Sequence, residues 1–157
     1  MSKDKKISKD NVSKNNKNLI GNSGEFFVAA ELSRRGLTAN VLLGNSEAVD
    51  ILALNVNSNN NYSIQVKTIS NKQKHWPLNK KNEKLIKNNL YYVFVRIIDF
   101  NNPEFYIVPS KKVANEITNS HKKWLGGDGK NSKTHKDNTM RVFTPDEKYK
   151  NKWDCFR

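Results

Sequence analysis

The chain has 157 residues, of which 36% are hydrophobic and 10% aromatic, so it can form one domain with a buried core. Its 28 Lys and Arg residues against 15 Asp and Glu residues give a formal charge of +13, which favours a polyanionic partner. An alternative explanation stays open. Lys accounts for 23 of the 28 basic residues and Asn is also abundant, as an AT-rich coding sequence would produce in any protein.

Several classes of protein are disfavoured by the same composition. No apolar stretch approaches the roughly 18 residues of a membrane span, and no apolar segment follows the Lys-rich N-terminus as in a secretory signal. The single cysteine, Cys155, cannot form an intrachain disulfide and has no Cys or His at metal-finger spacing. We therefore expect a soluble, cytoplasmic protein without a membrane partner.

The N-terminal residues 1–18 contain six Lys residues, no aromatic residue and little aliphatic surface. Such a segment cannot bury enough surface to offset its loss of entropy, so we predict a disordered basic tail followed by one domain over residues 19–157. A helix is predicted from Ser23 to Arg35, because Asn22 or Ser23 can cap its start and Gly36 can end it.

Alternating and β-branched segments predict the rest of the fold. The predicted strands cover residues 38–43, 48–54, 62–69, 91–98, 104–108 and 140–143, with a Lys-rich, helix-compatible segment at 80–88 and a helix over 109–121. Trp153 and Phe156 are expected to pack onto the body. The order α-β-β-β-(α)-β-β-α predicts an α/β fold in which helices flank a mixed sheet.

Asp50 interrupts an apolar predicted strand, where an ionised carboxylate is costly unless a cation compensates it. In the next strand, alternation places Gln65 and Lys67 on one face. If the two strands pair as a hairpin across the Asn-rich loop, Asp50 and this face converge. A carboxylate, an amide oxygen and an ammonium at one spot can hold a divalent cation, with the Lys left to orient a water or stabilise charge on a phosphate.

With these residues the sequence resembles the PD-(D/E)XK nuclease superfamily, which includes restriction enzymes, resolvases and homing endonucleases. The residues that carry the resemblance are Gly24-Glu25 at the start of the first helix, Val49-Asp50 on the second strand and Gln65-Val66-Lys67 on the third. The resemblance covers about residues 21–70 and implies the restriction-endonuclease-like fold. Val49 stands where proline is usual. Gln65 stands in the second acidic position, as it does in branches that resemble Mrr-type restriction enzymes.

The resemblance implies a metal-dependent deoxyribonuclease. Asp50 would be the principal ligand of Mg²⁺ or Mn²⁺, Gln65, Glu25 and the Val66 carbonyl would be further ligands, and Lys67 would be the catalytic lysine. The implied catalytic set is therefore Asp50, Gln65, Lys67 and Glu25. DNA is the implied partner, a homodimer is allowed, and no nucleotide cofactor is expected.

Each of these residues also has a structural explanation. Glu25 could form a capping box with Asn22 at the start of the helix. Asp50 alone could be a buried acid that accepts hydrogen bonds from backbone amides, and Lys67 alone could be an ordinary exposed strand residue. Their coincidence favours a site, because ionisable groups that cluster in apolar surroundings mark functional sites.

Further residues are candidates for nucleic-acid contacts. Lys72, Lys74, His75 and Trp76 follow the predicted catalytic strand, and cations beside an aromatic ring suit a phosphate backbone and an unstacked base. Trp76 could instead anchor its loop against the core. Arg141, on a predicted strand, is a candidate phosphate contact. The segment 126–130 is not a Walker loop, since it lacks the first glycine and follows a helix.

Three functions remain compatible with the sequence. The first is an endonuclease that acts on DNA. The second is a nucleic-acid-binding module with the same fold and weak or lost catalysis, which the neutral Gln65 keeps open. The third is a small interaction protein whose charge reflects composition alone. Fold does not separate these three functions.

Overall fold

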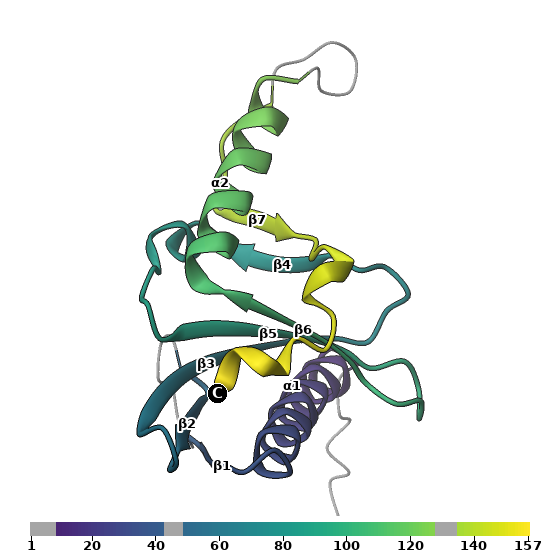
Figure 1. The fold of residues 1–157 in the computed structure, drawn as a ribbon. Coiled ribbons are helices and arrows are strands. Elements are labelled where there is room, and N and C mark those ends of the chain that lie inside the picture. Colours follow the sequence, from purple (N-terminus) through teal and green to yellow (C-terminus); the bar gives the residue numbers. More distant parts are fainter. Residues whose placement is uncertain (1–8, 43–48, 128–134) are drawn as a thin grey trace, which may run out of the picture.

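The computed structural model describes residues 9–42, 49–127 and 135–157. Its helices and strands are α1 (Lys9–Ser33), β1 (Leu37–Val41), β2 (Ile51–Asn55), β3 (Asn60–Ile69), β4 (Trp76–Asn79), β5 (Leu90–Arg96), β6 (Glu104–Pro109), α2 (Ser110–Leu125) and β7 (Met140–Phe143). Short 3-10 helices lie at η1 (Lys80–Lys84), η3 (Glu147–Tyr149) and η4 (Trp153–Phe156). Both α-helices and the strands appear in Figure 1.

The larger sheet has five strands in the order β1-β2-β3-β5-β6. The pairs β1-β2, β2-β3 and β5-β6 are antiparallel, whereas β3 and β5 are parallel, so the sheet is mixed. A second sheet consists of the antiparallel pair β4-β7. The connection from β3 to its parallel neighbour β5 passes through β4 and η1, which carries these two elements to one face of the larger sheet.

The two faces of the larger sheet are covered by different elements. α1 packs on one face, and α2 lies with β4 and β7 on the other (Figure 1). Side chains of β5 alternate between the two cores, with Val93 and Val95 on the α1 side and Tyr92 and Phe94 on the α2 side. This arrangement confirms the predicted α/β fold with helices flanking a mixed sheet.

The N-terminal helix is longer than the sequence predicted. α1 begins at Lys9 and crosses the predicted boundary at residue 18, so the expected disordered tail is wrong for residues 9–18, and residues 1–8 lie outside the described part. Residues 9–18 contain neither Pro nor Gly, and lengthening an existing helix avoids the cost of nucleation. Gly24 and Glu25 therefore lie inside α1, which rules out the capping box from Asn22.

Other differences concern short elements. β2 begins at Ile51 rather than at residue 48, so Asp50 lies in a bend directly before the strand, while residues 43–48 are outside the described part. β4 was not predicted, and the Lys-rich segment forms only the short η1. Trp153 and Phe156 are buried as predicted.

No helix in the described residues is long and apolar enough to cross a membrane, and the cytoplasmic location stays a prediction.

Candidate active site

The candidate site lies where β2 separates from β3. The ladder between them ends at the pair Ile51–Ile64, and the Asp50 amide extends it by donating to the Ile64 carbonyl at 2.8 Å. Beyond this point β3 continues to Ile69, and the Asp50 side chain takes the place of a neighbouring strand. Its Oδ2 accepts a hydrogen bond from the Val66 amide at 2.6 Å. The carboxylate is thereby held where the β2 ladder along β3 has ended, close in sequence to Gln65.

Gln65 is a buried amide with an unused oxygen. Only 5% of Gln65 is exposed, and its Oε1 has no hydrogen-bond partner among the described residues. Buried polar atoms without partners are uncommon, and each one calls for a ligand or another explanation. Across the parallel pair of strands Gln65 lies opposite Tyr92, whose hydroxyl accepts a hydrogen bond from Asn82 Nδ2 at 2.9 Å. Gln65 is therefore a polar group with an unsatisfied acceptor in an otherwise apolar part of the sheet.

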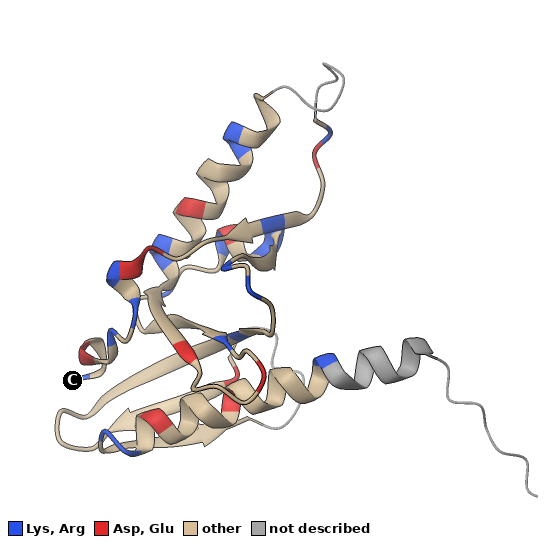
Figure 2. Ribbon diagram, turned by 90° about the vertical axis from the view of Figure 1, so that its right-hand side faces the viewer, with Lys and Arg blue, Asp and Glu red and all other residues tan. Residues whose placement is uncertain are grey.

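Lys67 is the only charged residue in β1, β2 and β3, all of which are fully described. The strands of the larger sheet carry few charged residues in Figure 2. Burial lowers the pKa of the Lys67 ammonium, the negative charges of Asp50 and Glu25 oppose this change, and the positive charge of Lys81 adds to it. Lys67 is therefore a half-buried cation whose nearest opposite charges come from the predicted site.

Glu25 approaches this site from α1. Burial raises the pKa of its carboxyl, the charge of Asp50 raises it further, and the charge of Lys67 lowers it. Gly24 makes the approach possible, because a Cβ at this position would collide with Thr68 Oγ1 and come within 3.0 Å of the Thr68 Cβ. The adjacent residues Gly24 and Glu25 thus have separate roles, close packing and charge.

Asp50 completes the group. Burial raises its pKa above the usual range, and the Val66 hydrogen bond and the Lys67 charge oppose the increase. The structure therefore brings Glu25, Asp50 and Lys67 within range of one another's charges, and Gln65 precedes Val66, whose amide binds Asp50. Two carboxylates and one ammonium leave a net negative charge that is partly removed from water.

These residues offer only oxygen donors to a cation. Asp50 and Glu25 supply carboxylates, Gln65 supplies its unpartnered amide oxygen, and Val66 supplies a backbone carbonyl. Mg²⁺ prefers such ligands and is commonly held by one or two carboxylates together with waters and substrate phosphates. No group of three or more His, Cys, Asp or Glu side chains suited to a metal occurs in the described residues. The donor set fits Mg²⁺ or Mn²⁺ bound jointly with a phosphate.

No protein-family model matches the sequence, and no curated protein matches it. Two solved structures resemble the chain. One is Hjc, a Holliday junction resolvase from the archaeal hyperthermophile Archaeoglobus fulgidus, with 13% identity and a TM-score of 0.47 over 79% of this chain and 83% of that one. The other is a bacterial homing endonuclease, with 11% identity and a TM-score of 0.49 over 88% of each chain.

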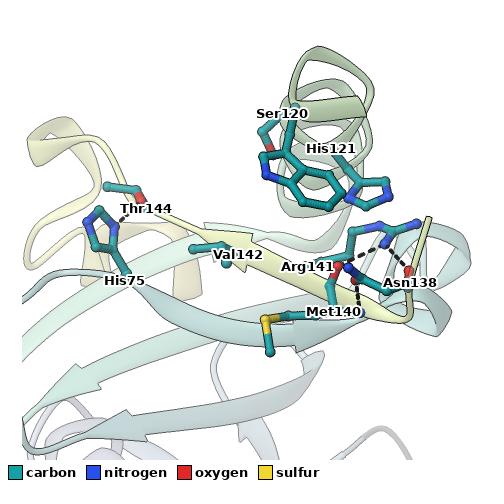
Figure 3. A pocket seen from close by; sticks show the side chains of 9 residues that line it. His75, Ser120, His121, Asn138, Met140, Arg141, Val142 and Thr144 are labelled. Atoms are coloured by element: carbon teal, nitrogen blue, oxygen red, sulfur yellow. Dashed lines mark hydrogen bonds between the residues drawn. The ribbon is translucent and has the colours of Figure 1, made fainter. Parts of the chain in front are cut away.

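Arg141 does not have the role predicted for it. Only 3% of the residue is exposed, and its guanidinium contacts the Glu83 carboxylate and donates to the carbonyls of Asn138 and Met140 at 2.7 and 2.8 Å. Figure 3 shows the side chain directed toward His121 of α2. Since these bonds use its donors inside the protein, Arg141 joins β7 to η1 and is not a phosphate contact.

Trp76 is also unavailable to nucleic acid. The residue is fully buried in β4, packs edge-on against Phe94 and Tyr106, and donates from Nε1 to the Val95 carbonyl at 3.2 Å. The alternative, in which Trp76 anchors its segment against the core, is therefore correct. A tryptophan followed by Pro77 and Leu78 carries the alternation of a short strand, and that signal was available in the sequence.

The remaining predicted contacts lie at the surface. Lys72 is exposed, and its carbonyl accepts from Arg96 at 2.9 Å. Lys74 pairs with Glu147. His75 Nδ1 lies 2.7 Å from Thr144 Oγ1 at one end of a pocket of about 560 Å³ between α2 and β7 (Figure 3). This pocket includes none of the four predicted catalytic residues, so the candidate site is an edge of the sheet and not this cavity.

Proposed function

We propose that the protein is a metal-dependent endonuclease that hydrolyses phosphodiester bonds in DNA, with its active centre at Asp50, Glu25, Gln65 and Lys67. One observation carries this proposal. The Val66 amide fixes the carboxylate of Asp50 at the edge of β3, and the charge of Asp50 acts on the half-buried ammonium of Lys67. Gln65, next to Val66 in the strand, has a buried side-chain oxygen without a partner among the described residues. Ionisable groups that cluster in an apolar sheet are candidates for a site that binds a charged ligand.

The metal ion would be held by Asp50 and Glu25, with Gln65 and the Val66 carbonyl as neutral ligands. When bound, Mg²⁺ or Mn²⁺ supplies Lewis-acid stabilisation of charge on the phosphate and makes a water more acidic. The Val66 amide orients Asp50 through its 2.6 Å hydrogen bond to one carboxylate oxygen, so the other oxygen can bind a ligand.

Lys67 acts on the substrate side in this proposal. Its ammonium can donate a hydrogen bond to the attacking water or to a phosphate oxygen on which charge develops. Because Lys67 lies within a strand, its position is fixed more rigidly than that of a loop residue. The excess of basic residues over acidic residues, which gives the chain its charge of +13, favours a polyanion such as DNA as the substrate.

A cleavage assay tests the proposal. Supercoiled plasmid and a labelled linear duplex are incubated with the full chain in Mg²⁺ or Mn²⁺, using Asp50→Ala and Lys67→Ala as site variants. Asp154→Ala and Lys152→Ala remove the same charges from an exposed pair outside the site and serve as controls. Each site variant should cut at least about 100-fold more slowly than the parent, as expected for loss of one group that stabilises the transition state.

The outcome of this assay can also overturn the proposal. Equal cutting by the parent, the site variants and the controls would assign the activity to something other than this site. Binding of DNA that weakens with salt, without cutting by the parent in either metal, would favour the second function, a binding module without catalysis. That alternative is kept by the neutral Gln65, because an amide gives the metal less charge than a carboxylate does.

A further inference from the structure

The pocket of about 560 Å³ between α2 and β7 has the size of a small-molecule site and includes no residue of the candidate active site. Three apolar residues in its lining are open to solvent, namely Trp124 (39% exposed), Val142 (46%) and Met140 (62%). Figure 3 shows α2 on one side of the pocket and β7 on the other. Exposed apolar surface that lines a hollow is a candidate binding surface.

Aromatic rings gather on the α2 side of this pocket. The indole ring of Trp124 stacks on His121 and on His135, with centroid distances of 5.3 and 4.0 Å and interplanar angles of 26° in both pairs. His121 is fixed in turn, because its Nε2 lies 2.8 Å from Asp137 Oδ1. The Trp124 ring is therefore held in place although more than a third of the residue is exposed. A fixed aromatic ring can stack with the planar face that every nucleobase offers.

The polar groups of the pocket suit a base that carries a phosphate. Ser120 Oγ donates to a backbone carbonyl of α2, which leaves its oxygen as an acceptor. Asn138 Oδ1 accepts from a backbone amide of β7, and its amide group remains a donor. None of the described residues that line the pocket is acidic. Lys122 and Lys123 directly precede Trp124 and are exposed, so the surroundings of the pocket admit an anion.

We propose that this pocket binds an unpaired nucleotide of a nucleic-acid strand, with the base stacked beside Trp124 and the groups of Ser120 and Asn138 available to its edge. The inference takes from the proposed function only the class of partner, and it adds a binding site outside the Asp50 site. Bases inside a duplex are covered by their neighbours, so the pocket selects single-stranded or extruded positions. The sequence predicted this role for Trp76, which is buried, whereas Trp124 is exposed.

Binding of a short oligonucleotide in EDTA tests this proposal. A fluorescein-labelled DNA single strand of about six nucleotides is titrated with the full chain, and anisotropy gives the affinity. Trp124→Ala should weaken binding at least about fivefold, as expected for the loss of one stacked base. Phe100→Ala removes a fully exposed aromatic ring elsewhere and should leave binding unchanged. Trp124→Phe keeps a ring and should retain most of the affinity, and circular dichroism checks the fold of each variant.

Tryptophan fluorescence gives a second readout of the same complex. Trp76 and Trp153 are buried, with 0% and 5% exposed, so a strand in the pocket should quench mainly the emission of Trp124. The unlabelled strand should therefore quench the parent and have little effect on Trp124→Phe. Equal quenching of the two proteins would place the strand elsewhere and overturn the inference.

Two further ligands separate base recognition from attraction by charge. An abasic strand of the same length keeps the phosphates, and a blunt duplex keeps its bases paired. The loss in Trp124→Ala should be absent with both ligands, and an equal loss with the abasic strand would overturn the inference. Thymidine monophosphate should compete only weakly with the labelled strand. Competition at the concentrations of the unlabelled strand would show that the ligand is a free nucleotide and overturn the assignment to a strand.

This inference and the nuclease proposal fail separately, because binding is measured without metal. Absence of strand binding by the parent, or equal binding by the parent and Trp124→Ala, would overturn the pocket assignment alone. Binding that depends on Trp124 in a chain that does not cut DNA supports the pocket and rejects the nuclease. Cutting that depends on Asp50, without binding that depends on Trp124, does the reverse.

Discussion

Two groups of polar and charged side chains in the described part of the chain differ in how completely they are paired. In the paired group, Arg141 contacts Glu83 and two backbone carbonyls, and Asp137 lies 2.8 Å from His121. In the site group, Asp50 accepts one backbone hydrogen bond and Gln65 Oε1 accepts none among the described residues. The first group is paired within the protein, and the second is only partly paired among the described residues.

The pKa values of the acids separate the two groups in the same way. Hydrogen bonds from Lys80 and His121 lower the pKa of Asp137 to about 2. Burial raises the pKa of Asp50 and of Glu25. Ionisation therefore stabilises the folded protein at Asp137 and destabilises it at the site. Unfavourable ionisation in a charged cluster marks a candidate functional site, which supports the site proposed at Asp50.

Removing Arg141 gives the largest expected effect on stability. Arg141→Ala should lower the free energy of unfolding by about 3 kcal/mol, because it leaves Glu83 as a partly buried charge without its partner. Lys80→Ala, which breaks an exposed pair with Asp137, should cost less than about 1 kcal/mol. Urea unfolding of the two variants measures both changes.

The same variants test whether Arg141 binds phosphate. A structural Arg141 leaves the salt slope of DNA binding unchanged when it is replaced, provided that the measurement is made where the variant is folded. If the slope falls by about 0.9 while stability changes little, Arg141 belongs with the site group and the division between the two groups is wrong.

The next largest effect on stability is expected from changes at the contact between α1 and β3. Gly24→Ala forces a methyl group against Thr68 and should cost about 1 to 2 kcal/mol, since overpacking outweighs the gain in helix propensity. Gly21→Ala is the matched control, because a Cβ there meets nothing within 4 Å and should add up to about 1 kcal/mol of stability.

If Gly24→Ala lowers the stability and Gly21→Ala raises it, Gly24 sets the spacing of Glu25 from β3. Thermal unfolding measures both changes in stability, and cleavage rates of the folded variants show whether the spacing matters for activity. Equal stabilisation by both substitutions would mean that α1 can shift without cost, so that Glu25 is not held at the site.

The sequence predicted those parts of the fold and site that depend on local pattern. Alternation in β3 placed Gln65 and Lys67 on one face, and β7 has the predicted bounds. The start of α1 was missed because helix extension through a polar segment leaves no hydrophobic signal. The ion pair between Arg141 and Glu83 was missed for a different reason. Arg141 looks like any strand arginine until Glu83, far away in the chain, is brought beside it by η1.

Lys81 is a second residue whose surroundings the sequence could not predict. It belongs to a segment rich in lysine, and nothing local distinguishes it from Lys80 or Lys84. Only the folded chain shows that Lys80 pairs with Asp137, whereas Lys81 forms no ion pair among the described residues. Motif spacing can therefore identify the residues on β3, whereas the residues that surround them come from segments whose approach depends on the whole topology.

Replacing aspartate by asparagine should change the free energy of unfolding by a smaller amount, and the change should have opposite signs in the two groups. Asp50 has a raised pKa, so its ionisation costs stability as pH rises from about 3.8 through the folded value, and Asp50→Asn should be more stable than the parent at neutral pH. Asp137 has a lowered pKa, so Asp137→Asn should be less stable at neutral pH. Asparagine can still accept the Val66 hydrogen bond, which limits the change at position 50 to charge.

Both differences in stability should shrink as the pH falls, but over different pH ranges. The gain in Asp50→Asn disappears as pH falls below about 4, where the parent carboxyl is protonated in both states. The loss in Asp137→Asn fades only as pH falls toward 2, through the folded pKa. Urea unfolding in EDTA between neutral pH and about pH 3 measures these differences. A destabilised Asp50→Asn at neutral pH would show that Asp50 is a satisfied structural acid, and the contrast between the two groups would then disappear.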